Sequence, residues 1–159
     1  MEQNQVWEFV ESSNFTPEIT RKAIPSKLFL KMKYKSDGTT DKLKSRLVVG
    51  GHKQYNLDSI ETYAPTAATE NILSILALGK PLGLKFFATD IPSAYLHANL
   101  KVSDPIFMKI SSSISDIISE RSSKRYQHSD GYIYVKLKKC LYGLRQSGKQ
   151  WNMLITAEF

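Results

Sequence analysis

Cysteine and histidine are scarce in this 159-residue chain, and their scarcity excludes two kinds of cross-link. The single cysteine, Cys140, cannot form an internal disulfide. The three histidines, His52, His97 and His128, are far apart in the sequence and have no cysteine cluster beside them, so the sequence contains no zinc-binding motif. With 42% hydrophobic residues, the chain is expected to fold as one globular unit around an apolar core.

Long hydrophobic runs are also missing. The longest, at 72–78 and 84–88, are far shorter than the roughly 20 residues that cross a bilayer. Met1 is followed by Glu2, which is unlike the basic and apolar start of a secretory leader. From these features we expect a soluble, intracellular protein with no membrane partner.

Acidic residues are sparse in two stretches that are rich in bases. The whole chain carries a net charge of +7, with 22 lysines and arginines against 15 acids. Residues 21–53 contain ten basic and two acidic residues, and residues 136–149 contain five basic residues and no acidic one. Such stretches are typical of a surface that binds phosphates or of an ordinary solvated face, and composition alone leaves both interpretations open.

Part of the first basic stretch has an alternating pattern that predicts a β-hairpin. Residues 28–35 and 42–49 alternate apolar and mostly basic side chains, and residues 36–39 have the composition of a turn. The two strands would present six cations on one face, namely Lys31, Lys33, Lys35, Lys42, Lys44 and Arg46. Like charges that face each other across a sheet destabilise it, so the pattern favours an anion bound against this face.

A helix and a further strand are predicted next. Thr69 is placed to cap a helix whose apolar residues recur at helical spacing until Gly79, and this stripe is expected to pack into the core. Residues 84–90 are expected to form a strand with Asp90 at the end of its apolar face. Core packing does not explain a carboxylate there, although an exposed or helix-capping acid remains an alternative.

The rest of the chain alternates between strand and loop signals. Strands are predicted at 106–110 and 132–137, on either side of a serine-rich segment. That segment, residues 111–130, contains eight serines and is typical of a mobile surface insertion. Gly143 and Gly148 indicate a loop, and the apolar positions from Trp151 onward indicate a helix.

Several short motifs follow one another in a defined order. They are WEFV at 7–10, IPSK at 24–27, KSRLV at 44–48, GGHKQ at 50–54, ETYAPT at 61–66, TDIPSAYL at 89–96 and KKCLYGLRQSG at 138–148. Their order resembles the amino-terminal part of the copia-type (Ty/copia) LTR-retrotransposon reverse transcriptases. The resemblance implies an α+β fold of the right-hand polymerase type, with residues 21–80 fingers-like and residues 81–159 forming a partial palm.

The same resemblance implies roles for individual residues. Asp90 would be the first catalytic carboxylate and a ligand of Mg²⁺, in a family that uses two such ions about 3.5–4 Å apart. Lys44 and Arg46 would bind the triphosphate of a dNTP, since a guanidinium can hold phosphate oxygens in two places. Tyr95 would lie beneath the sugar and select dNTP over rNTP, which is compatible with a partly core position. Gln146 would contact the incoming nucleotide and the template.

Other basic residues would contact the nucleic-acid backbone. They are Lys31, Lys33, Lys35, Lys42, Arg145 and Lys149.

The sequence departs from the family pattern in one decisive respect. The family places a Tyr-x-Asp-Asp hairpin downstream of the motif at 138–148, and that pair of carboxylates completes the metal site. Here only Glu158 follows the motif as a carboxylate, so we expect the 159 residues alone to polymerise nothing measurable. Smaller departures are Pro92 beside Asp90 and the serine-rich segment in place of a Pro-x-Gly turn.

The function implied is that of a piece of an RNA-directed DNA polymerase within a retrotransposon Pol polyprotein. Its partners would be an RNA or DNA template-primer, dNTPs and the other Pol regions. It would act in the cytoplasm, in the virus-like particle of the parent element or in the nucleus. The alternatives are a non-catalytic nucleic-acid-binding module that uses the two basic stretches, and a relic that does not fold stably because its apolar surface and sheet edges are uncovered.

Overall fold

A computed structural model describes residues 5–11, 15–55, 60–111, 114 and 126–158 of the protein. The structure contains both helices and a mostly antiparallel sheet, which agrees with the expected mixture of α and β structure. The elements are β1 (Trp7–Phe9), α1 (Pro17–Lys22), β2 (Ile24–Tyr34), β3 (Thr40–Val49), the short helix η3 (Gly51–Lys53), α2 (Thr69–Gly79), the short helix η5 (Ala94–His97), β4 (Phe107–Ser111), β5 (Tyr132–Leu137) and α5 (Ser147–Glu158).

The strands form one five-stranded sheet in the order β1-β5-β4-β2-β3. β5 pairs antiparallel with both β1 and β4, so that Val135 lies opposite Phe9 on one side and Met108 on the other. β2 joins β4 through two parallel pairs only, Ile24 with Met108 and Pro25 with Lys109. Therefore only the base of the β2–β3 hairpin belongs to the packed part of the sheet.

The core lies around β4 and β5. Met108, Ile110 and Val135 are buried in the main cluster, which also receives Leu47 and Val49 from the base of β3. Tyr134 points to the opposite face of β5, where it is buried in a second, smaller cluster. Because both faces of β5 are covered, three consecutive residues of this strand are buried, and the strand anchors the fold.

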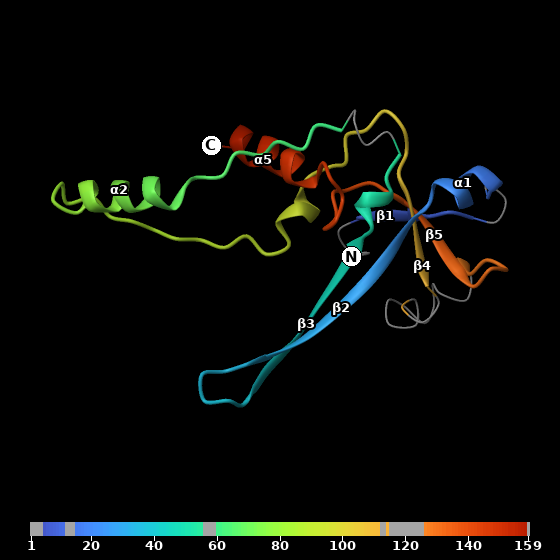
Figure 1. The fold of residues 1–159 in the computed structure, drawn as a ribbon, viewed down its shortest axis with the longest axis horizontal. Helices are drawn as coiled ribbons and strands as arrows, with labels where there is room; N and C mark the ends of the chain where they lie inside the picture. Colours follow the sequence, from blue (N-terminus) through green and yellow to red (C-terminus); the bar gives the residue numbers. More distant parts are fainter. Residues whose placement is uncertain (1–4, 12–14, 56–59, 112–113, 115–125, 159) are drawn as a thin grey trace.

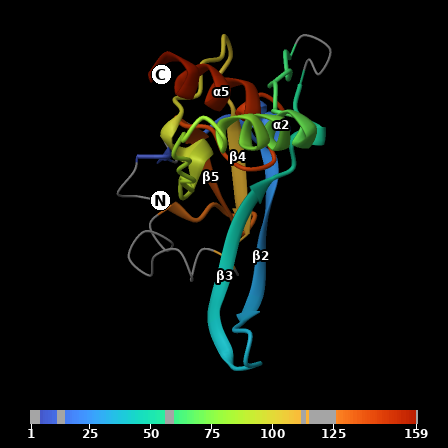
Figure 2. The ribbon, with the colours of Figure 1, turned by 90° about the vertical axis from the view of Figure 1, so that its left-hand side faces the viewer.

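The β2–β3 hairpin projects from this packed region, as Figures 1 and 2 show. Its registry confirms the predicted cationic face, since Lys31 is the cross-strand partner of Lys44 and Lys33 that of Lys42. At the predicted turn, the carboxylate of Asp37 accepts hydrogen bonds from the backbone N–H and the hydroxyl of Thr39, at 2.9 and 2.6 Å. We call residues 28–46 of this hairpin the arm.

Helix α2 forms where the sequence predicts it, but two details of the prediction are wrong. Thr69 is the first helical residue, and the capping position is Ala68, which offers no side-chain hydrogen bond. The apolar stripe is not packed in the core, because Leu73 is 60% exposed and Ile72 48% exposed. Figure 1 shows the reason, since α2 lies at the far end of a long excursion from the sheet.

The predicted strand at 84–90 is also wrong. These residues have no regular secondary structure and are exposed, and the side chain of Phe87 is 92% exposed. A strand requires a neighbour to receive its backbone hydrogen bonds, and no described strand pairs with this segment. The alternating pattern is present, but the ladder that would make it a strand is not.

The carboxyl-terminal half follows the prediction more closely. β4 and β5 confirm the strands expected at 106–110 and 132–137, within a residue at each end. Most of the serine-rich segment, at 112–113 and 115–125, lies outside the described residues. The expected carboxyl-terminal helix is present but begins at Ser147, so Gly148 lies within α5 and not in the loop. Among the described helices, none is long and apolar enough to cross a membrane.

Candidate functional site

A pocket of about 360 Å³ brings together two of the predicted phosphate-binding residues and the predicted catalytic carboxylate. We call it the cationic pocket. Lys44 and Arg46 reach it from β3, and Asp90 reaches it from the extended segment that follows α2. Its lining consists of residues 44–47, residues 90–93, Leu96 and Tyr142. Three parts of the chain that are distant in sequence therefore meet at one site.

β3 positions its two cations by alternation. Lys44 and Arg46 are two residues apart and lie on one face of the strand, while Leu47 and Val49 further along are buried in the core. The charges of Arg46, Lys33 and Lys42, in that order, lower the pKa of Lys44, and the charge of Asp90 acts in the opposite direction. The cations therefore repel one another, and Asp90 offsets part of that repulsion.

The segment that carries Asp90 is tied to the core just beyond it. Asp90 is exposed, but Leu96, six residues later in η5, is buried in the main cluster. Between them Ser93 adopts a left-handed conformation with φ 55°, which is uncommon for a residue with a side chain. The imidazole Nε2 of His97 lies 3.2 Å from the carbonyl oxygen of Pro92. These features fold the segment back so that Asp90 faces β3.

Tyr95 lies beside the cationic pocket and does not line it. Its ring is half-buried and lies 4.8 Å from the ring of Tyr142, centroid to centroid. The same Tyr142 ring receives the guanidinium of Arg46 at 5.9 Å. Tyr142 carries no predicted role, yet it connects Tyr95 with Arg46.

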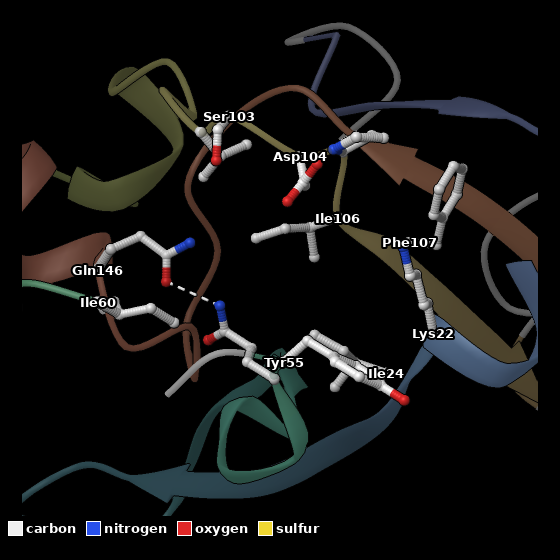
Figure 3. Close-up of a pocket in the computed structure, with 12 residues that line it drawn as sticks. Lys22, Ile24, Tyr55, Ile60, Ser103, Asp104, Ile106, Phe107 and Gln146 are labelled. Carbon is white, nitrogen blue, oxygen red and sulfur yellow. Dashed lines mark hydrogen bonds between the residues drawn. The ribbon is translucent and has the colours of Figure 1, made fainter. Parts of the chain in front are cut away.

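Gln146 lies in a different cavity, of about 170 Å³, which Figure 3 shows. Its side chain is 5% exposed, and its Oε1 accepts a hydrogen bond of 3.0 Å from Nε2 of Gln54. Oε1 of Gln54 accepts the backbone N–H of Arg145, also at 3.0 Å. Gln146 is thus built into a buried amide pair, and the structure does not bring it to the cationic pocket.

The predicted nucleic-acid contacts divide into two groups. Along the arm, Lys31, Lys33, Lys35 and Lys42 are exposed, and no ion pair of the described residues includes any of them. Cross-strand neighbours on this face are cations facing cations. This arrangement costs free energy in the isolated chain and favours a bound polyanion.

Three of the five cations in the second basic stretch, residues 136–149, lie beside carboxylates from other parts of the chain. Lys138 and Lys136 lie 2.7 and 3.6 Å from the carboxylate of Glu8, and Lys149 forms an ion pair with Glu61. The hydrogen bond from Lys138 is the main cause that lowers the pKa of Glu8. Arg145 is exposed. This stretch therefore resembles an ordinary solvated face more closely than the arm does.

The described residues provide one carboxylate ligand for a divalent ion, but they do not form a site for two ions. Mg²⁺ prefers hard oxygen ligands and usually retains water and substrate phosphates in its coordination shell. Asp90 is the carboxylate of the cationic pocket, and no group of three or more candidate metal-binding side chains occurs within the described ranges. Asp90 therefore offers one carboxylate, while a two-ion site needs further carboxylates.

Comparison with known proteins identifies the class. The family description "Reverse transcriptase (RNA-dependent DNA polymerase)" matches residues 4–159, nearly the whole chain. The chain belongs to this reverse transcriptase family. Enzymes of the family use divalent metal ions, in keeping with a carboxylate in the cationic pocket.

The curated relatives place the chain in the copia-type branch. It is similar to the retrovirus-related Pol polyprotein from transposon TNT 1-94 of Nicotiana tabacum, with 30% identity over 134 residues, 84% of this chain and 9% of that protein. It is also similar to that from transposon RE1 of Arabidopsis thaliana, with 31% identity over 134 residues, 80% of this chain and 8% of that protein. A third relative, the uncharacterized mitochondrial protein AtMg00820 of Arabidopsis thaliana, is 34% identical over 83 residues, 52% of this chain and 46% of that protein.

The chain spans less than a tenth of the length of the two Pol polyproteins. No solved structure gives a significant match to it. The copia-type resemblance deduced from the motifs is confirmed, and the chain corresponds to a piece of a reverse transcriptase.

Proposed function

We propose that this chain supplies the nucleotide-binding corner of an RNA-directed DNA polymerase, with Lys44 and Arg46 binding the triphosphate and Asp90 providing one metal-binding carboxylate. The observation that carries the proposal is the single pocket that all three residues line. Residues 21–80 would act as the fingers and residues 81–159 as part of the palm, so that the pocket lies where the two parts meet.

The charge arrangement supports this role. A triphosphate carries more negative charge than the single carboxylate of Asp90. Its binding would therefore reduce the repulsion between Lys44 and Arg46 on β3. The planar fork of Arg46 can bind two phosphate oxygens at once, and Lys44 adds a point charge beside it. Asp90 lies at the edge of this cationic surface, where it can share an ion with the phosphates it would otherwise repel.

Each chain residue would have a simple task in the reaction. Arg46 and Lys44 would hold the phosphates and stabilise the charge that develops on them during nucleotide transfer. Tyr95, beside the pocket, would limit space near the sugar and so favour dNTP over rNTP. When bound, divalent ions supply further charge stabilisation to the entering and leaving oxygens.

Binding of dATP to the purified chain tests the proposal, measured by calorimetry with Mg²⁺ present. Arg46→Gln should weaken binding about tenfold or more, as expected for loss of a charge-assisted hydrogen bond. Arg21→Gln removes the same charge from α1, outside the pocket, and should leave the affinity unchanged. Equal affinities for the wild type and Arg46→Gln would refute the proposal.

A second candidate function is binding of nucleic acid without catalysis, which the cations of the arm favour because no ion pair among the described residues includes them. Filter binding to an RNA–DNA duplex across a salt series would detect it, together with primer extension on an RNA template. Salt-dependent binding in a chain that binds no dNTP would favour this candidate over the first.

A further inference from the structure

Tyr142 is the aromatic residue among those that line the cationic pocket together with Asp90, Lys44 and Arg46. It comes from the motif at 138–148, where the resemblance drew attention to Gln146 four residues later. The structure separates these two residues, since Gln146 is paired with Gln54 in another cavity. The loop therefore contributes a ring to the pocket.

The backbone fixes this ring relative to β3. The N–H of Val49 donates a 2.8 Å hydrogen bond to the carbonyl oxygen of Tyr142. Gly143, the next residue, has φ +95°, and a Cβ at that position would overlap the carbonyl oxygen of Val49. The loop can approach β3 this closely because residue 143 is glycine. The loop that carries Tyr142 is therefore joined by a backbone hydrogen bond to β3, the strand that carries Arg46.

The two side-chain contacts of Tyr142 join two parts of the proposed substrate site. A guanidinium 5.9 Å from the ring centroid is within the range of a cation–π interaction. The Tyr95 ring, at 4.8 Å and tilted by 47°, is within the range of an attractive aromatic pair. Moving the Tyr142 ring would release both neighbours at once.

We infer that Tyr142 is a positioning residue that holds the triphosphate-binding Arg46 and the sugar-selecting Tyr95 in fixed relation. The inference rests on the proposed function and deepens it. Arg46 has little rotational restraint of its own, because it is exposed and forms no ion pair with any described residue. The Tyr142 ring supplies that restraint. Arg46 and Tyr95 would then contact the phosphates and the sugar of one nucleotide in a fixed relation.

Three probes separate the two contacts in the full 159-residue chain: inorganic tripolyphosphate, dATP and ATP. Tyr142→Leu should weaken tripolyphosphate binding about two- to fivefold, the value of a cation–π contact, and should also reduce the preference for dATP over ATP. Tyr142→Phe keeps the ring and should preserve both properties. Tyr55→Leu, at an exposed tyrosine of the other cavity, is the matched control and should change neither.

The dATP-to-ATP ratio distinguishes positioning from general loosening, because a merely structural defect lowers both affinities together. If Tyr142→Leu does not fold, NMR of the wild-type chain decides, since the ring resonances of Tyr142 should shift with tripolyphosphate while those of Tyr55 should not. Triphosphate binding that responds to Arg46→Gln but not to Tyr142→Leu, or ring resonances that stay unchanged, would overturn this inference and leave the proposed function standing. A wild type that binds no triphosphate would overturn both.

Discussion

The two ends of β3 show how differently one alternating pattern behaves in this protein. At its base, Leu47 is 4% exposed and belongs to the main core cluster, which also contains residues of β4, β5 and the loop before α5. At its tip, Leu43 is 57% exposed, although it continues the same alternation. The difference lies in the neighbours, since Leu47 belongs to the main core cluster and Leu43 does not. Lys44 and Arg46 lie between the buried base and the exposed tip, where β3 leaves the core and enters the solvent.

α2 and β5 repeat the same contrast on a larger scale. Both are apolar, but β5 is covered on two faces, while α2 lies apart from the sheet. Packing energy is therefore concentrated in the β1-β5-β4 region and the base of the hairpin. The arm and α2 contribute charge and apolar surface that are available to other molecules.

The largest expected effect is on the stability of the packed region. Leu141→Ala, at a fully buried position, should lower the free energy of unfolding by about 2–5 kcal/mol. Leu73→Ala makes the same change on the exposed face of α2 and should alter it by about 0.5 kcal/mol or less. Urea denaturation measures both. Equal losses would mean that α2 is buried in solution, for example by self-association.

Two glycines with positive φ test the same contrast through the backbone. Gly143→Ala should cost about 1–2 kcal/mol for the left-handed conformation, and the overlap with Val49 should add to that cost. Gly38→Ala, at φ +83° in the arm's turn, has open space around it and should show the conformational cost alone. Thermal denaturation of the two variants should give a clearly lower Tm for Gly143→Ala. A Tm for Gly38→Ala that lies below the Tm of Gly143→Ala would contradict the structure of the loop.

Tyr134 gives the packed region a dependence on alkaline pH. Burial, and then its 2.6 Å hydrogen bond to Asp130, raise the pKa of Tyr134 from 10.0 to about 12. Because the folded pKa is above the unfolded one, this contribution to stability is complete below pH 10 and is lost as the pH rises toward 12. Tyr134→Phe should flatten the loss of stability across that interval, whereas Tyr63→Phe, at an exposed tyrosine, should retain it.

The smallest predicted change concerns the arm. Lys31→Gln should make the salt dependence of duplex binding shallower by about 0.7–0.9 in the slope of log affinity against log salt, the value for one lost phosphate contact. Lys136→Gln removes a lysine that already lies beside Glu8, so its slope should remain close to that of the wild type. A larger change for Lys136→Gln would move the binding surface from the arm to the second basic stretch.

The sequence predicts best the parts whose structure depends on near neighbours. The hairpin follows from a period of two and from the Asp37-Gly38 turn, and both are local signals. The helix α1 was not predicted, although Thr16, Pro17 and Glu18 form a recognisable helix start, with the Thr16 hydroxyl accepting the N–H of Ile19.

The features that the sequence did not predict depend mostly on distant partners. Residues 84–90 were expected to be a strand, but no described strand pairs with them. Gln146 is buried because Gln54, 92 residues away in the sequence, receives it. Tyr142 gains its place from a hydrogen bond to β3 and from Gly143. Motifs therefore located the segments of the site, and tertiary contacts decided which side chains enter the pocket.

The most direct test of the account is the affinity for dATP of the wild type and of Asp90→Asn, each measured with and without Mg²⁺. Without the ion, Asp90 repels the triphosphate, so Asp90→Asn should bind dATP more tightly than the wild type. With the ion, the carboxylate becomes attractive, and the same substitution should weaken binding. A reversal of sign between the two conditions is the predicted result. A change in the same direction in both conditions, or no change, would show that Asp90 does not face the nucleotide.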